Sequence, residues 1–252
     1  MAYLGTQYKG WQRQINTQQS VQEVLENTFN KMTGTKMSIM GCGRTDVGVH
    51  ALQYFAHFDF EKEWDYDPLE RINRMLPNDI AVYEFIPVHD RAHTRYDALR
   101  RTYAYHIHLE KNPYHTSFST YYETKELDLG LIQTGLESLL TVKDFKHLCL
   151  TPDRFDNTLC TLTEAKMESS FDGKKLCFRF ASNRFLRSMI RIIVARLLAL
   201  GEGKISLETF MDEKISNQQL NIRNLAFPQG LHLTKIVYPY LDREPNTSFL
   251  IQ

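Results

Sequence analysis

A β-hairpin signal in the C-terminal half of the chain constrains the fold more than any other feature. The dipeptide Asp172-Gly173 stands between two runs rich in β-branched and aromatic residues, 162–168 and 175–181. Such a dipeptide between strand-like runs predicts a tight turn, and a hairpin makes its two strands antiparallel. Similar composition predicts further strands over residues 36–40, 53–60, 80–86, 101–109 and 231–238.

Helical patterns interrupt these strands. Ser20 and Glu23 form a capping box ahead of apolar residues at helical spacing, and Gly34 ends that pattern. Two further helices are predicted by the same periodicity and by their flanking residues. Their ranges are 129–140, with Asp128 as the cap, and 185–200, ended by Gly201.

The order of these elements indicates the fold class. Strands joined by hairpins and interrupted by helices predict an α+β fold with an antiparallel sheet, in place of a doubly wound parallel sheet. A charged stretch over residues 91–100 separates two strand-rich parts. We therefore expect an N-terminal half, residues 1–94, and a C-terminal half, residues 95–252, that work as one integrated unit.

Several classes of protein are disfavoured by what the sequence lacks. No run approaches the roughly 18 to 20 apolar residues of a membrane-spanning helix, and the first residues have no signal-peptide pattern, so we expect a cytoplasmic protein. The cysteines form no C-x-x-C pair, and His89 and His93 have no third ligand nearby. Nucleophile-elbow, phosphate-loop and H-E-x-x-H motifs are missing as well. We predict no metal site.

Charge bears on nucleic-acid binding. Thirty basic and thirty acidic side chains give no net charge, which counts against a protein that must neutralise phosphates. Basic residues nevertheless gather in two segments, and a neutral total can hide a basic cleft. These residues are Arg91, Arg95, Arg100 and Arg101, and then Arg179, Arg184, Arg187, Arg191 and Arg196.

The sharpest local feature is the segment from Gly43 to Gly48, which contains Arg44 and Asp46. Glycines on both sides allow tight bends that present a carboxylate at the apex of a loop. A plain turn is the alternative, because aspartate is common in turns. Arg44 could contact a phosphate or hold the loop.

A second feature is the strand pattern of residues 101–105, which sends Arg101, Tyr103 and Tyr105 to the same face. A tyrosine platform beside a cation suits a base that has left its helix, because the ring stacks on the base while arginine meets phosphate. Tyrosines in the core of a half-buried strand are the alternative.

A third feature is the basic spacing around the predicted helix over residues 185–200. Helical periodicity would align Arg184, Arg187 and Arg191 along one side. For Arg184 and Arg187 a solvated basic face is the alternative. Arg191 lies in an apolar run, where a buried guanidinium requires a fixed anionic partner.

Taken together, these segments resemble the TruA family of tRNA pseudouridine synthases over nearly the whole chain. Residues 43–51 differ at one position from the family's catalytic G-R-T-D-A-G-V-H-A. The other similar segments are residues 3–14, 73–80, 93–95, 101–105, 185–191 and 230–233. Leu4, Ala92 and Cys160 depart from the family pattern, and the chain begins inside the family's first strand.

The resemblance implies a pseudouridine synthase fold, with two largely antiparallel halves, flanking helices and a catalytic cleft between them. It implies a homodimer that isomerises uridines 38 to 40 in the anticodon stem-loop of tRNA without a cofactor. The reaction breaks the N1–C1′ bond and rejoins the uracil through C5. Two alternatives are the same chemistry on another RNA, and an RNA-binding or RNA-folding module whose catalysis is dispensable.

The resemblance also implies roles for individual residues. Asp46 is the expected catalytic carboxylate, which attacks C1′ or abstracts a sugar proton. Arg191 is its expected ion-pair partner. Tyr103 is expected to stack on the flipped uracil and to serve in proton transfer at C5, and Arg44 to help extrude the nucleotide. The expected phosphate contacts are Arg91, Arg95, Arg184 and Arg187.

Overall fold

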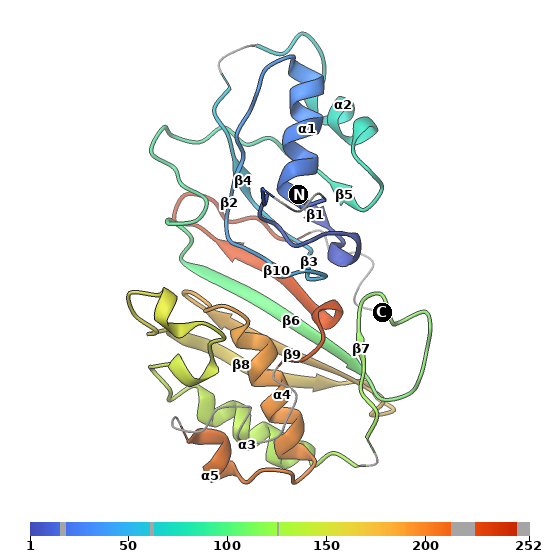
Figure 1. Ribbon diagram of the computed structural model, residues 1–252, viewed down its shortest axis with the longest axis vertical. Coiled ribbons are helices and arrows are strands. Elements are labelled where there is room, and N and C mark those ends of the chain that lie inside the picture. Colours follow the sequence, from blue (N-terminus) through green and yellow to red (C-terminus); the bar gives the residue numbers. More distant parts are fainter. Residues whose placement is uncertain (16–18, 61–62, 125, 213–224, 246–252) are drawn as a thin grey trace. The chain divides into compact units, whose positions relative to one another are not determined.

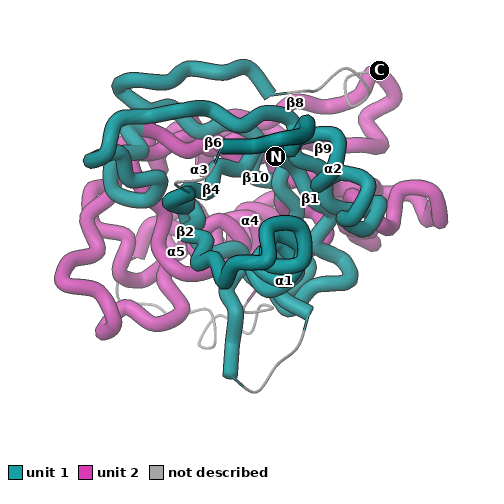
Figure 2. Tube along the Cα trace, turned by 90° about the horizontal axis from the view of Figure 1, so that it is seen from above, with its two compact units in different colours: residues 1–99, 232–252 teal, residues 100–231 magenta. Residues whose placement is uncertain are grey.

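A computed structural model of the chain describes residues 1–15, 19–60, 63–124, 126–212 and 225–245. The chain divides into two compact units (Figure 2). Unit 1 consists of Met1–Leu99 and His232–Gln252, and unit 2 consists of Arg100–Leu231. Unit 2 is therefore inserted between two parts of unit 1 along the chain. The expected halves, residues 1–94 and 95–252, stay a prediction.

Unit 1 is built on short strands. They are β1 (Ala2–Tyr3), β2 (Met40–Gly41), β3 (His50–Ala51), β4 (Ala56–His57), β5 (Ile80–Ala81) and β10 (Leu231–Val237), nearly all of which belongs to this unit. The strand order β5-β1-β3-β10 is drawn in Figure 1. β1 pairs antiparallel with both neighbours, whereas β10 runs parallel to β3. β2 and β4 form a separate antiparallel pair. The ends of the chain thus meet in one sheet.

The helices α1 (Val21–Thr33) and α2 (Pro68–Met75) pack against each other in unit 1 (Figure 1). At the start of α1, the Ser20 side chain accepts a hydrogen bond from the backbone N–H of Glu23, and Gly34 ends the helix with φ 68°. The predicted helix and both of its signals are confirmed. A short 3-10 turn, η1 (Gly5–Gln7), follows β1.

Strands predicted in unit 1 pair over fewer residues than expected. The predicted ranges are 36–40, 53–60 and 80–86, of which only β2, β4 and β5 form ladders. In the first range the Asn30 side chain of α1 accepts the N–H of Met37 at 2.7 Å. In the third, the Asn73 amide of α2 accepts the N–H of Val82 and donates to its carbonyl, at 2.8 and 2.7 Å. Helix side chains therefore take the place of strand partners.

Unit 2 contains the long strands. They are β6 (Arg100–His108), β8 (Leu162–Ser169) and β9 (Lys175–Ser182), with the short β7 (Thr120–Tyr121). β9 lies between β6 and β8 and is antiparallel to both, and β7 pairs parallel with β6. Gly173 has φ 69° in the turn between β8 and β9, and Asp172 accepts a hydrogen bond from the N–H of Lys174. The predicted hairpin is confirmed, and so is the α+β class with its largely antiparallel sheet.

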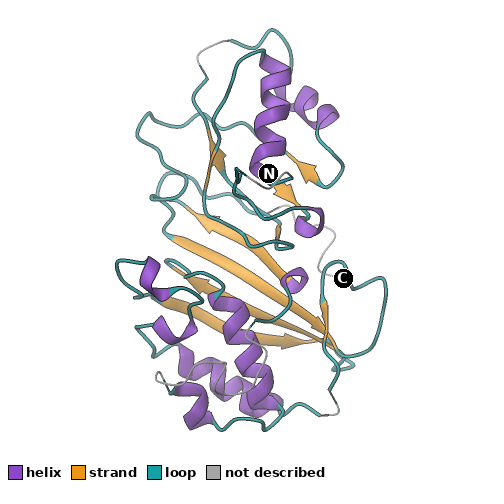
Figure 3. Cartoon of the chain, in the orientation of Figure 1, coloured by secondary structure: helices purple, strands orange, loops and turns teal. Residues whose placement is uncertain are grey.

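Helices α3 (Leu129–Leu139), α4 (Met189–Gly201) and α5 (Leu207–Met211) gather together in unit 2 (Figure 3). Asp128 caps α3 as predicted, accepting from the N–H of Leu131 at 2.8 Å. α3 packs on β8 and α4, and the core includes fully buried Phe178, Phe180 and Ile193. The 3-10 turns are η2 (Lys146–Leu148), η3 (Pro152–Arg154) and η4 (Pro228–Gly230).

α4 begins four residues later than predicted. Ser188 has φ 58°, a left-handed conformation that the helix cannot pass through, so residues 185–188 lie outside it. Arg184 and Arg187 therefore precede the helix, and the prediction that helical spacing aligns them with Arg191 is wrong. The carbonyl of Arg187 instead accepts the N–H of Leu150 at 3.2 Å.

Candidate active site

Asp46 lies in the loop that joins β2 to β3 in unit 1. The N–H of Val49 donates to the carbonyl of Asp46 at 3.2 Å, and Gly48 has φ 78°. Residues 46–49 therefore form a turn of the kind that requires glycine at its third position. Asp46 is half-buried, whereas Thr45 before it is buried and Arg44 is exposed. The loop thus holds one carboxylate at the start of a tight turn.

Two glycines near the start of the chain fit closely against this loop. A Cβ on Gly5 would lie 2.0 Å from the carbonyl oxygen of Val49, and one on Gly10 would lie 2.5 Å from that of Thr45. The N–H of Trp11 donates to the same Thr45 carbonyl at 3.2 Å. The opening segment and the Asp46 loop are therefore in backbone contact, which leaves no room for side chains at Gly5 and Gly10.

Aromatic side chains support the loop from within unit 1. The Trp11 and Tyr54 rings stack with centroids 4.0 Å apart, and the Tyr54 hydroxyl donates to the carbonyl of Gly43. The hydroxyls of Tyr3 and Thr45 lie 2.9 Å apart in the interior. Gly41 leaves space for these rings, because a Cβ there would lie 2.2 Å from the Tyr54 hydroxyl oxygen. The loop that carries Asp46 is fixed on several sides.

A buried histidine pair lies at the end of the loop. His50 on β3 and His232 on β10 stack with ring centroids 4.6 Å apart. Nδ1 of His50 accepts the N–H of Gly5 at 3.1 Å, so that nitrogen carries no proton. Sequence reasoning did not single out either histidine for this role. The parallel pairing of strands from opposite ends of the chain, which brings them together, has no local signal.

The two tyrosines of β6 differ in environment. Tyr105 is fully buried, at 0% exposure, and its hydroxyl contacts Thr120 Oγ1 at 2.9 Å and the carbonyl of Phe227 at 2.7 Å. Burial raises the pKa of this phenol. Tyr103 is half-buried, and its ring meets Phe185 edge-on with centroids 5.2 Å apart. The core alternative is therefore correct for Tyr105, and the role of Tyr103 at uracil stays a prediction.

The arginines of α4 also differ. Arg191 is half-buried, and its Nε donates to the carbonyl of Ala226 at 2.7 Å. Arg196, which sequence reasoning treated only as part of a basic cluster, is fully buried, with Nη1 3.4 Å from the carbonyl of Phe210. Burial lowers the pKa of Arg196 to about 10. Its place inside the apolar run of α4 was the available signal.

The expected phosphate contacts are divided between the two units. Arg91 and Arg95 lie in unit 1 and are exposed, and the Arg95 guanidinium lies 5.8 Å from the ring centre of Tyr96. In unit 2, Arg187 is exposed, and Arg184 lies over the Phe155 ring at 5.7 Å. Unit 1 thus carries Arg44 and Asp46 in one loop, while unit 2 carries Tyr103 and Arg191. The ion pair between Asp46 and Arg191 stays a prediction.

Two features are absent from the described part of the chain. No group of three or more His, Cys, Asp or Glu side chains is placed to hold a metal ion there. None of the helices in that part is both long and apolar enough to cross a membrane.

The chain is similar to known proteins over nearly its whole length. The chain is 33% identical over 244 residues to tRNA pseudouridine synthase A of Porphyromonas gingivalis, covering 95% of each chain. It is 36% identical over 243 residues to the Bacteroides fragilis protein of the same name, covering 95% of this chain and 94% of the relative. The chain belongs to the tRNA pseudouridine synthase family. The family model described as tRNA pseudouridine synthase matches residues 137–239.

Membership of the tRNA pseudouridine synthase family confirms the resemblance drawn from the motifs. The family model covers α4 and Arg184, Arg187 and Arg191, but neither Asp46 nor Tyr103. Those two residues fall within the similarity to full-length relatives, which also includes the Exiguobacterium sibiricum tRNA pseudouridine synthase A, 33% identical over 94% of each chain.

Proposed function

We propose that this chain converts uridine to pseudouridine in the anticodon stem-loop of tRNA, at positions 38 to 40, with Asp46 as the catalytic carboxylate. The observation that carries the proposal is the full-length similarity to proteins named tRNA pseudouridine synthase A. The bracing of the Asp46 loop supports the choice of carboxylate, because a catalytic group must be held in a fixed geometry.

The reaction is an isomerisation and needs no net oxidant or reductant. The N1–C1′ bond breaks, the uracil turns, and a C5–C1′ bond forms. C5 loses a proton and N1 gains one, so atoms and charge balance. Asp46 either attacks C1′ to form a covalent intermediate or abstracts a sugar proton. In both routes the carboxylate must be ionised and within reach of the ribose.

Tyr103 and Arg191 complete the proposed chemistry. Tyr103 stacks on the flipped uracil and assists the proton transfer at C5. Its half-buried position on a rigid strand, packed edge-on against Phe185, is consistent with a stacking platform. Arg191 stabilises the ionised form of Asp46, since a nearby cation favours a carboxylate over a carboxylic acid.

Binding to RNA rests on arginines outside the reaction. Arg44 helps to extrude the target nucleotide, and the phosphate contacts are Arg91, Arg95, Arg184 and Arg187. Because the chain has no net charge, a continuous basic surface must be gathered from a few residues. A homodimer acting in the cytoplasm, where each subunit extends the surface of the other, supplies that continuity.

Tritium release tests this proposal directly. Loss of the C5 proton frees tritium from tRNA labelled at C5 of uridine, and sequencing of the product locates the modified positions. We expect release by the wild-type chain at positions 38 to 40 and none above background by Asp46→Asn, with RNA binding retained. Asp65→Asn, at an exposed carboxylate of the same unit, is the matched control and should remain active.

The same assay separates the alternatives. Tritium release from an RNA other than tRNA would indicate the same chemistry with a different substrate. Binding without release by the wild-type chain would indicate an RNA-binding module. Activity of Asp46→Asn within about tenfold of wild type, roughly 1.4 kcal/mol, would remove Asp46 from the reaction.

A further inference from the structure

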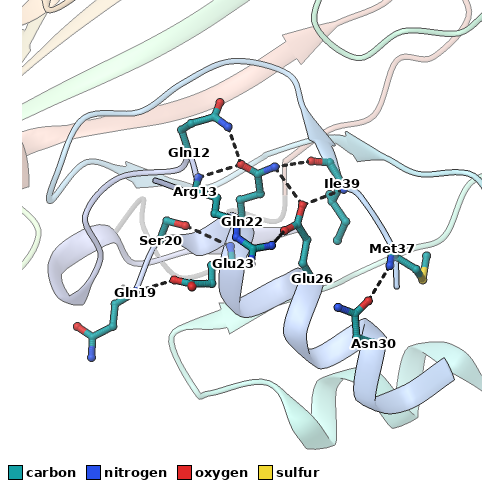
Figure 4. Close-up of polar contacts among 10 residues, drawn as sticks. All are labelled: Gln12, Arg13, Gln19, Ser20, Gln22, Glu23, Glu26, Asn30, Met37 and Ile39. Carbon is teal, nitrogen blue, oxygen red and sulfur yellow. Dashed lines mark hydrogen bonds and ion pairs between the residues drawn. The ribbon is translucent and has the colours of Figure 1, made fainter. Parts of the chain in front are cut away.

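A network of polar side chains connects α1 to the opening segment of the chain (Figure 4), and Gln12 of that segment bonds Arg44 in the Asp46 loop. It begins at Glu26, a buried residue of α1 with 4% exposure. One carboxylate oxygen of Glu26 accepts from the Arg13 guanidinium at 2.8 Å. The other accepts from the Gln22 amide at 3.1 Å and from the N–H of Ile39 at 3.2 Å. Three donors therefore satisfy this buried charge and hold it in place.

Gln22, one turn before Glu26 on α1, has all of its amide groups engaged. Its oxygen accepts from Gln12 Nε2 and from the N–H of Arg13, both at 2.9 Å. Its nitrogen donates to Glu26 and, at 2.9 Å, to the carbonyl of Ile39. The reversed amide would direct N–H groups at two donors, so only one orientation satisfies the network. The orientation of the Gln22 side chain is therefore fixed.

Gln12 links Gln22 to the Asp46 loop through hydrogen bonds at both ends of its amide. Its nitrogen is directed at Gln22, so its oxygen points the other way and accepts from Arg44 Nε at 3.1 Å. The Arg44 side chain is exposed, and among the described residues its polar contact is the bond to Gln12. A guanidinium held through Nε presents the edge formed by its two terminal nitrogens, and that edge can bind a phosphate with two hydrogen bonds.

We propose that Gln12 is a positioning residue that orients the Arg44 guanidinium toward an RNA phosphate next to the target nucleotide. The inference rests on the proposed function and deepens it, because it assigns the arginine of the Asp46 loop a ligand and a support. Arginine has about 2 kcal/mol of side-chain rotamer entropy to lose on binding. A neighbour that already holds Nε reduces this loss, and Glu26 and Gln22 hold that neighbour.

A purely structural role for Gln12 is the competing explanation, since the network also joins the opening segment to α1. The two explanations differ in what happens when Arg44 is absent. If Gln12 acts through Arg44, its removal has no further effect in an Arg44→Ala chain. If Gln12 only stabilises unit 1, its removal lowers activity by the same factor in both chains. It also lowers the free energy of unfolding by the same amount in both.

The test is a double-mutant cycle on Gln12→Ala and Arg44→Ala, measured as kcat/KM for tritium release and as Kd for tRNA. We expect Gln12→Ala to lower kcat/KM about tenfold and to raise Kd about tenfold, which is the scale of one hydrogen bond to a charged group. In the Arg44→Ala background it should change them less than twofold. Gln14→Ala, at an exposed residue of the same segment, is the matched control and should match wild type.

Three results would overturn the inference. These are effects of Gln12→Ala and Arg44→Ala that multiply, an effect of Gln12→Ala below twofold, and a loss of activity that follows a lowered Tm. Gln12→Met keeps the length of the side chain but offers Arg44 only a weak acceptor, and it replaces Gln12→Ala in the cycle if that variant folds poorly. A wild-type chain without tritium release defeats the proposed function, and the binding arm of the cycle still decides whether Gln12 acts through Arg44.

Discussion

The hydroxyl groups of Tyr3 and Thr45 lie 2.9 Å apart in the interior of unit 1. Tyr3 belongs to β1, and Thr45 directly precedes the residue proposed as the catalytic carboxylate. The pair therefore links the first strand to the loop by a hydrogen bond that is shielded from water. Both residues are buried, so a hydroxyl left behind by substitution loses this bond without regaining a water molecule.

Tyr3→Phe tests this link. We expect the free energy of unfolding to fall by about 1 to 2 kcal/mol, because Thr45 keeps a buried hydroxyl that has lost its partner. Thr45→Val alone should cost a similar amount. The double variant should cost clearly less than the two single variants together, as measured by urea denaturation. Additive costs would contradict the coupling.

Gly10→Ala should be more harmful than Gly34→Ala. Both glycines have positive φ, 84° and 68°, so both substitutions cost about 1 to 2 kcal/mol for the left-handed backbone. Only at Gly10 does the added methyl meet a backbone oxygen, that of Thr45 at 2.5 Å, while nothing lies within 4 Å at Gly34. We expect Tm to fall further for Gly10→Ala than for Gly34→Ala. Turnover should be lost only in Gly10→Ala. Equal Tm values would show that the close approach is unimportant.

Tyr105→Phe and Tyr103→Phe should separate stability from reaction. Tyr105→Phe removes a hydroxyl that serves Thr120 and the carbonyl of Phe227, and should lower the free energy of unfolding by about 1 to 3 kcal/mol. Tyr103→Phe keeps its ring contact with Phe185 and should leave tRNA binding near wild type while impairing turnover. Normal turnover of a folded Tyr103→Phe would dismiss the hydroxyl from the reaction.

Acidification should destabilise the chain partly through His147. Burial, and secondarily the nearby Arg196 charge, lowers the pKa of His147 to about 4 in the folded state. An unfolded histidine has a pKa near 6.5, so between about pH 6.5 and 4 the unfolded chain binds the extra proton. The free energy of unfolding therefore falls as the pH falls through this window. His147→Gln should show a shallower fall, measured by urea denaturation from pH 7 to pH 4.5, whereas parallel curves would exclude His147.

The fold follows from the sequence where local signals agree with one another. Asp172-Gly173 fixes the hairpin of β8 and β9, and the Ser20 cap fixes the start of α1. Periodicity alone could not show that Ser188 takes a left-handed conformation, so the start of α4 was misplaced. Nor could strand composition show that Asn73 pairs with the backbone of Val82. The Asn73 side chain on α2 takes the place of a strand partner for Val82, so pairing along β5 ends at Ala81.

In the candidate site, too, local features follow from the sequence, whereas contacts between separate segments do not. The glycine spacing predicts the bend at Asp46, because the conformation of Gly48 is a local property. The network behind Arg44 depends on Gln12, Gln22 and Glu26. In the sequence, Gln22 and Glu26 look like ordinary polar residues of a helix surface, and Gln12 like a polar residue of a loop. Their partnership arises only when the opening segment folds against α1, and sequence periodicity carries no information about that contact.

The insertion of unit 2 within unit 1 has a consequence for biosynthesis. Unit 2 is continuous in sequence, so β6 to β9 and their helices can assemble on a nascent chain before β10 has left the ribosome. β3, which follows the Asp46 loop, must wait for β10 to pair with it. The first part of the chain to be synthesised is thus the last to be completed, and a pause in translation before residue 231 leaves β3, which follows the Asp46 loop, paired with β1 but not with β10.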